Sequence, residues 1–273
     1  MWFIILSSVI ILFLFYIMAG IVCTIKKNNG IMDVFYGLGY FIVVFTAFIL
    51  DYMLNRILSV RKVIVTFLVL FWAIRLSTYI FVRNRGKPED WRYAAMRKRW
   101  KDSGKNVFLK SLTSIYMFQA LVIFIVVFPV LWINVNNDVP LTNLLELSSV
   151  LFFIGVAIWI IGFYYETIGD YQLYKFLKNP NRTKKVMDQG LWKYAQHPNY
   201  FGEVTMWWGL FIIAITIPWG FITIFAPAYI TFQIIKVSGV KLLNKRFKGD
   251  DEYAIYKRKT SSFFPWFPKK EKT

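Results

Sequence analysis

The densest group of chemically versatile side chains lies in the segment 190–203. It contains the only histidine of the chain, His197, which is followed by Pro198 and Asn199. Because proline restricts the residue before it, these three residues predict a turn, and Asn199 could cap a helix that begins near Tyr200. Unpaired N–H groups at a helix start attract anions such as phosphates. A capping turn at a membrane boundary would use the same residues, so the motif alone leaves both interpretations open.

Three lysines lie close to this turn in the sequence: Lys184, Lys185 and Lys193. Charged donors make the strongest hydrogen bonds to phosphate oxygens. If the helix start binds an anion, we expect these lysines to neutralise it.

Charged residues also occur inside long apolar segments. Such positions are costly in a bilayer, so each is a candidate for function. Asp33 and Tyr36 are one helical turn apart and would share a face. Glu166 and Asp170 would share another face, and Arg75 lies deep enough to need a partner or a water-filled cavity. The acidic groups could instead lie at the membrane interface, with their charged ends in water.

The elements that must position these residues are membrane-spanning helices. Hydrophobic residues make up 57% of the 273-residue chain, and they fall in blocks near the roughly 20 residues that a spanning helix needs. Backbone polar groups in the hydrocarbon core must be satisfied internally, so the blocks predict helices. We therefore expect an all-α integral membrane protein with one polytopic domain and about seven helices. The predicted helices lie near 1–25, 31–54, 63–82, 111–135, 144–170, 202–217 and 219–235.

Three segments between and after these helices are rich in both bases and aromatic residues: 83–110, 171–201 and 236–273. Seven helices place all three on one side, which the excess of Lys and Arg assigns to the cytoplasm. The N-terminus would then be outside and the C-terminus inside. Flexible loops contain few aromatic residues, so we expect these segments to fold over the helix ends and form a cap.

The bases Arg56, Arg61 and Lys62 fall on the predicted outer side and count against this orientation, but they are outnumbered.

The formal net charge is +18, from 33 Lys and Arg against 15 Asp and Glu. Because these bases lie between apolar blocks rather than on a separate domain, we expect the lipid bilayer as a partner and no nucleic acid. The single cysteine, Cys23, excludes an intrachain disulfide. One Cys and one His are too few for a Cys/His metal cluster, so no metal site is expected.

Several motifs, in order, resemble the steroid 5α-reductase-like membrane family, in particular its bacterial DUF1295 group. The segment 190–203, followed by Trp207-Trp208-Gly209, is similar to the family signature. Residues 84–88 resemble the Asn-Arg-Gly-Arg-Pro of steroid 5α-reductases, and residues 89–93 resemble the DUF1295 group. Further matches are Tyr165-Glu166, Gly169-Asp170, and a tail with Tyr253 and Tyr256 that closes at Phe264-Pro265. Related signatures occur in sterol reductases and in isoprenylcysteine carboxyl methyltransferases.

The resemblance implies a seven-helix enzyme of the bacterial inner membrane. It would bind NADPH from the cytoplasm and transfer hydride to the β-carbon of a conjugated enone in a small lipophilic substrate. The cofactor-binding residues carried over to this sequence, including basic contacts to the phosphates, are Arg75, Asn84, Arg85, Asp170, Lys184, Lys185, Tyr194, His197, Asn199, Tyr200 and Arg246.

The sequence departs from the family where the enone oxygen would be polarised. Steroid 5α-reductases use a Glu on the second helix and a Tyr on the third. Here the second helix offers Asp33 and Tyr36, and the third contains the segment 72–75, Trp-Ala-Ile-Arg, without a Tyr. We therefore predict Asp33, Tyr36 and Glu203 as catalytic residues, with a steroid-like or another lipid enone as substrate.

Two other functions fit parts of the same pattern. The residues 197–200 and a downstream acidic residue are shared with isoprenylcysteine methyltransferases, which use S-adenosylmethionine. A non-enzymatic lipid-binding protein would need no cofactor, but it would leave Arg75 and the His197 turn unexplained.

Overall fold

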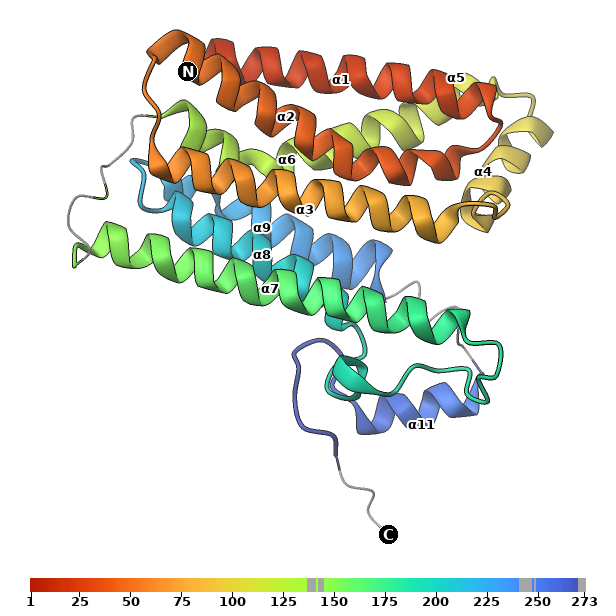
Figure 1. The fold of residues 1–273 in the computed structure, drawn as a ribbon. Helices are drawn as coiled ribbons and strands as arrows, with labels where there is room; N and C mark the ends of the chain where they lie inside the picture. The colour runs from red at the N-terminus through yellow and green to blue at the C-terminus, as the bar shows by residue number, and fades with distance from the viewer. Residues whose placement is uncertain (137–140, 142–144, 241–246, 248, 270–273) are drawn as a thin grey trace. The chain divides into compact units, whose positions relative to one another are not determined.

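A computed structural model describes residues 1–136, 141, 145–240, 247 and 249–269 of the chain. In these residues the regular structure is helical (Figure 1), apart from one isolated bridge between Ala195 and Ser261. Long apolar segments form helices because a helix satisfies its own backbone hydrogen bonds. The predicted all-α fold class is confirmed.

Six helical segments within the described ranges are long and apolar enough to cross a membrane. They are Trp2–Ile25, Asn29–Asn55, Val60–Asn84, Val107–Val135, Leu147–Lys178 and Gly220–Val237. A further apolar helix, α8 (Pro198–Ala214), has 17 residues, which is at the lower limit for a span. The count is therefore close to the seven helices predicted. The orientation of the chain in the membrane stays a prediction.

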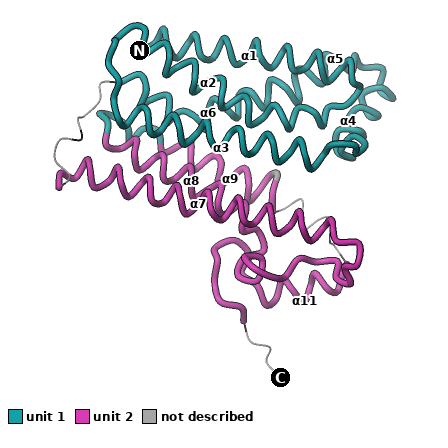
Figure 2. The backbone as a smooth tube through the Cα atoms, in the orientation of Figure 1, with its two compact units in different colours: residues 1–143, 217–223 teal, residues 144–216, 224–273 magenta. Residues whose placement is uncertain are grey.

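The helices form two compact units (Figure 2). Unit 1 comprises residues 1–143 and 217–223. Its helices are α1 (Trp2–Ile25), η1 (Asn29–Ile31), α2 (Met32–Asn55), α3 (Val60–Asn84), α4 (Trp91–Asp102), α5 (Val107–Ser111), η2 (Leu112–Tyr116) and α6 (Met117–Val135). Helix α2 contacts α1, α3 and α6 and forms the centre of this unit.

Unit 2 comprises residues 144–216 and 224–273. Its helices are α7 (Leu147–Lys178), η3 (Gly190–Lys193), α8, α9 (Phe225–Phe232), η5 (Gln233–Ser238) and α11 (Asp251–Lys259). The short helix η4 (Gly220–Ile224) precedes α9 in the chain. The main contact of unit 2 is the one between α7 and α8.

Glycines hold α7 and α8 at backbone contact distance. A Cβ on Gly155 would lie 2.7 Å from Gly209 O, and a Cβ on Gly162 would lie 2.6 Å from Gly202 O. Residues of increasing number on α7 therefore face residues of decreasing number on α8, so the helices are antiparallel. The glycines recur every seven residues, which keeps them on one face of each helix.

Several predicted boundaries differ from the structure. Helix α7 continues to Lys178 rather than ending near residue 170, because Tyr171–Lys178 contains no Gly or Pro, and it stops where Asn179 precedes Pro180. Helix α8 begins at Pro198 rather than at 202, since proline suits the first helical position. The predicted helix 219–235 is a succession of η4, α9 and η5.

Two bases that the sequence placed on the outer side are buried in the first turn of α3. Arg61 is 0% exposed, and Lys62 Nζ pairs with the buried Asp51 Oδ2 at 2.6 Å. Asn55 Nδ2 donates to the other oxygen of Asp51 at 2.7 Å. Lys62 therefore serves as an internal counter-charge that joins α2 to α3, and not as a free loop cation.

The glycine contact predicts a large effect from one methyl group. A Cβ on Gly202 would overlap Glu166 N and Gly162 O. Because backbone atoms cannot move aside, Gly202→Ala should destabilise the protein by about 1–3 kcal/mol. Chemical denaturation of the detergent-solubilised protein measures this. Ala157→Val, on the exposed face of α7, is the control and should change stability little. Equal stability of the two variants would contradict the close approach.

Candidate functional site

The glycine register brings two predicted site residues together at the end of the α7–α8 pair. A Cβ on Gly169 would lie 3.1 Å from Asn199 N, and Asn199 Nδ2 donates to Asp170 Oδ1 at 3.0 Å. Asp170 is 5% exposed. The prediction that Asn199 caps the helix is wrong, because α8 starts at Pro198, two residues before Tyr200, and His197 occupies the N-cap position. The Asn199 side chain instead links α8 to α7.

His197 is buried beside this pair and is 1% exposed. Its ring stacks on Tyr200, with centroids 5.5 Å apart and planes 22° from parallel. Burial lowers the pKa of His197 to about 4, so the imidazole is neutral near pH 7. Nε2 has no hydrogen-bond partner among the described residues.

Two more polar atoms near the start of α8 also have no hydrogen-bond partner among the described residues. Asn199 Oδ1 and Gln196 Oε1 are buried, and no described residue makes a hydrogen bond to either. Buried polar groups in proteins nearly always have partners, so unsatisfied atoms call for an explanation. The neutral His197 and the Asn199 amide are groups that a polar ligand at the start of α8 could satisfy.

The polypeptide before α8 is fixed by contacts to α7. Gly190 adopts a φ of +58°, a conformation that other residues rarely take, and it packs against Gln172. Gln172 Oε1 accepts a hydrogen bond from Leu191 N at 2.9 Å, and Trp192 Nε1 donates to Gly169 O at 3.0 Å. The turn that carries His197 is therefore anchored to α7 rather than free in solvent.

The C-terminal segment anchors the same turn from its other side. Tyr256 of α11 donates its hydroxyl to Trp192 O at 2.6 Å. Gln196 N donates to Ser261 O at 2.9 Å, and Gln196 Nε2 donates to Thr260 O at 2.7 Å. Gln196 and Gln172 were missed as positioning residues. Gln196, Trp192 and Tyr256 lie in motifs of the family resemblance, which was the available signal, whereas Gln172 lies outside them.

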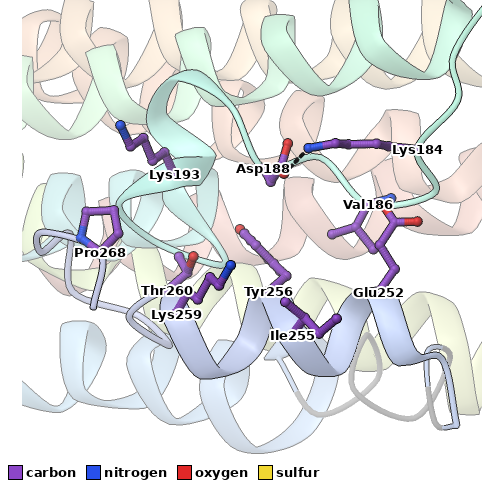
Figure 3. A pocket seen from close by; sticks show the side chains of 10 residues that line it. All are labelled: Lys184, Val186, Asp188, Lys193, Glu252, Ile255, Tyr256, Lys259, Thr260 and Pro268. Carbon is purple, nitrogen blue, oxygen red and sulfur yellow. Dashed lines mark hydrogen bonds and ion pairs between the residues drawn. The ribbon is translucent and has the colours of Figure 1, made fainter. Parts of the chain in front are cut away.

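A cavity of about 360 Å³ lies between the segment 184–193 and α11 (Figure 3). It is lined by Lys184, Val186, Asp188, Lys193, Glu252, Ile255, Tyr256, Lys259, Thr260 and Pro268. Lys184 Nζ pairs with Asp188 at 2.5 Å, which raises the pKa of Lys184. The Lys185 and Val186 amides donate to Glu252. The role of Lys184 and Lys185 as phosphate contacts stays a prediction.

Other predicted residues of unit 2 lie around the same turn. Tyr194 is 37% exposed, and its carbonyl oxygen accepts a hydrogen bond from Trp266 N at 2.9 Å. Tyr200 stacks on His197 as described above, and Glu203 is partly buried one turn further along α8. Arg246 lies outside the described residues.

In unit 1, Asp33 is the centre of a polar cluster. Tyr93 of α4 donates its hydroxyl to Asp33 Oδ1 at 2.6 Å. Gln119 Nε2 lies 3.4 Å from Asp33 Oδ1, and Arg92 lies 3.9 Å from Oδ2. Burial and the negative charge of Asp33 raise the pKa of Tyr93, so its phenol stays protonated. Tyr36, the predicted partner of Asp33, makes a hydrogen bond of 2.9 Å with Tyr40.

Helix α4 is held in place by its own acidic residues. Burial tends to raise the pKa of Asp90, but hydrogen bonds from the Arg92 side chain and backbone lower it overall. Asp90 also caps the helix. Glu89 accepts hydrogen bonds from Asn29 N at 2.7 Å and from Arg97 at 2.5 Å. These bonds bring Tyr93 to the start of α2. Tyr93 was missed as a site residue, although it lies in the segment 89–93.

The remaining predicted cofactor residues of unit 1 are Arg75, inside α3, and Asn84 and Arg85, at its end. Arg75 lies over the Tyr79 ring at 5.6 Å, and Arg83 lies over the same ring at 5.5 Å. Asn84 Oδ1 accepts a hydrogen bond from Arg83 Nε at 3.2 Å. Arg85 is exposed.

A family profile described as protein of unknown function, DUF1295, matches residues 2–260. This chain belongs to the DUF1295 family. The expected membership is thereby confirmed over nearly the whole chain. No curated protein and no solved structure matches the sequence.

Tyr93→Phe should weaken the attachment of α4 to α2. It removes a hydrogen bond to a carboxylate, which is worth about 1.5–3 kcal/mol in stability. Chemical denaturation of the solubilised protein measures the loss. Tyr52→Phe, on the same helix as Asp33 but exposed, should have little effect. A Tyr93→Phe protein as stable as the wild type would show that the Asp33 bond contributes nothing.

The buried His197 should make the protein less stable in mild acid. Its folded pKa of about 4 lies below the ordinary value of 6.5, so between these values the unfolded state binds more protons. Stability is then unaffected above pH 6.5 and falls by about 3 kcal/mol as the pH drops to 4.

The check compares wild type with His197→Gln by denaturation at several pH values. Other acidic groups titrate in both proteins, so the difference between the two curves isolates the histidine. We expect the variant to lose less stability over this pH range. Parallel curves would mean that the pKa of His197 is the same in the folded and unfolded protein, which contradicts the lowered pKa.

Proposed function

We propose that this protein is an NAD(P)H-dependent membrane reductase that transfers hydride to a conjugated C=C bond of a steroid-like or other lipid enone. The observation that carries the proposal is the polar site at the start of α8. There Asn199 is tied to Asp170, while Asn199 Oδ1 and His197 Nε2 are buried without described partners. This is the position at which the family resemblance expects cofactor contacts.

The residues present fit a nucleotide. Asn199 Oδ1 can accept a hydrogen bond, and the neutral His197 can donate or accept one at Nε2. Asp170 orients the Asn199 amide, since only the amide NH₂ can donate to a carboxylate. Lys184 and Lys185 are proposed to contact the phosphates. A bound NAD(P)H would supply the hydride, and the protein would bind, orient and shield it.

In unit 1 we assign the lipid oxygen to the Asp33–Tyr93 cluster. The raised pKa of Tyr93 keeps its proton on the phenol at neutral pH. Tyr93 donates this single proton to Asp33, so to bind the carbonyl oxygen of the lipid the hydroxyl would turn its O–H from Asp33 to that oxygen. Gln119 Oε1 is buried without a partner among the described residues, so it can accept a bond from a polar substrate. Tyr36 and Glu203 remain proposed catalytic residues.

The second candidate is a methyltransferase that uses S-adenosylmethionine. It is kept because the residues 197–200, with Glu203 downstream, are shared with isoprenylcysteine methyltransferases. The uncharged His197 would suit either ligand.

Nucleotide binding tests the proposal directly. Purified protein in detergent should quench or shift NADPH fluorescence, and Asn199→Ala should weaken the affinity about tenfold or more by removing a buried hydrogen bond. Asn181→Ala, in the exposed loop after α7, is the matched control and should bind like the wild type. The melting temperature of each unliganded variant separates a loss of binding from a loss of folding.

Thermal stabilisation distinguishes the two candidates. A ligand of the folded state at a concentration of 100 Kd stabilises it by about 2.7 kcal/mol. We expect NADPH to raise the melting temperature and S-adenosylmethionine to leave it unchanged. The reverse result would support the methyltransferase, and no shift with either ligand would contradict both enzymes.

A further inference from the structure

The C-terminal segment 261–268 exposes large aromatic side chains on a fixed backbone. Phe264 is 70% exposed, Trp266 is 72% exposed and Phe267 is 75% exposed. The helix that precedes them, α11, is polar and presents charged residues. Clustered exposed aromatic residues beside a polar helix indicate a surface that contacts something else.

This segment is held by hydrogen bonds and is not a loose tail. Trp266 N donates to Tyr194 O at 2.9 Å, and Lys269 N donates to Lys259 O at 2.9 Å. Gln196 fixes Thr260 and Ser261 through the bonds described above. The backbone that carries the exposed rings is therefore fixed in one conformation.

A chain of ring contacts joins the segment to the apolar helices of unit 2. Phe264 lies 5.9 Å from the Phe201 ring of α8, and Phe201 lies 5.1 Å from the Tyr165 ring of α7. Tyr165 follows Ile160 and Ile161 on α7, which are 56% and 51% exposed. The aromatic segment is thus joined through ring contacts to a helix with large exposed apolar side chains.

Figure 1 agrees with these contacts: α11 and the tail fold back beside α7 rather than extending beyond its end. Helix α7 continues from Tyr165 to Lys178, about 20 Å further at 1.5 Å per residue. The loop after α7 therefore lies well beyond the level at which the aromatic segment sits.

Basic residues adjoin the aromatic segment. Lys193 precedes Tyr194, whose carbonyl oxygen accepts the hydrogen bond from Trp266 N. The carbonyl oxygen of Lys259 accepts the hydrogen bond from Lys269 N. Lys193 and Lys259 also line the cavity of Figure 3 together with Pro268. Aromatic rings next to lysines are the combination that favours the headgroup region of a bilayer with anionic lipids.

We infer that the segment 261–268 docks on the membrane surface, with Phe264, Trp266 and Phe267 at the headgroup level and Lys193, Lys259 and Lys269 on anionic phospholipids. Contact with the membrane would thereby help to hold the C-terminal segment against the turn that precedes α8.

Depth-dependent quenching tests the inference in proteoliposomes. The only native cysteine, Cys23, is buried, so a Cys23→Ser background allows one environment-sensitive fluorophore at Phe267→Cys or, as control, at Asn181→Cys. Lipids with a nitroxide near the headgroup should quench the label at position 267 several-fold more than the label at 181. Adding phosphatidylglycerol to phosphatidylcholine should increase the quenching at 267.

Substitution of Lys193, Lys259 and Lys269 by glutamine should remove the effect of phosphatidylglycerol on the label at 267. Equal quenching at 267 and 181 would overturn the inference, and so would quenching that does not respond to anionic lipid. The fluorescence of the label at 267 should not depend on the ratio of protein to lipid. If it changes when the protein is diluted with more lipid, the rings contact a second copy of the chain, and this result would also overturn the inference.

Discussion

The backbone contact between α7 and α8 is the constraint on which the rest of unit 2 depends. Helices in lipid gain little from burying apolar side chains against each other, because the lipid is equally apolar. Close packing then has to supply the attraction, and Gly155, Gly162, Gly202 and Gly209 remove the side chains that would prevent it. The same register decides which polar residues meet at the ends of the helices.

The polar site follows from that register. Once the helices are in contact, Gly169 lies against Asn199, and the next residue of α7 is the carboxylate that Asn199 binds. Anchoring of the preceding turn by Trp192 and Tyr256 then buries His197 in a place where its charged form is disfavoured. The buried neutral imidazole and the adjacent amide each keep a polar atom without a described hydrogen-bond partner, which costs stability.

Unit 1 manages its buried charges differently. Lys62 and Asp51 neutralise one another at one end of α2, whereas Asp33 at the other end is satisfied mainly by a phenol, Tyr93, and by Gln119. An ion pair between fully buried partners holds two helices together. Asp33 is bonded to neutral donors, with the cation Arg92 at 3.9 Å, so we propose the Asp33 cluster and not the close Asp51 ion pair for substrate contact.

The sequence by itself determined the helical membrane class, the family and most of the spans, because long apolar blocks have few other solutions. It also indicated Asp170, Asn199 and His197. Only the tertiary structure decided that Asn199 bonds to Asp170 instead of capping α8. It also decided that Asp33 is paired with Tyr93, whose helix lies far along the chain. Spacing along one helix reveals shared faces, whereas contacts between helices depend on packing that no local pattern records.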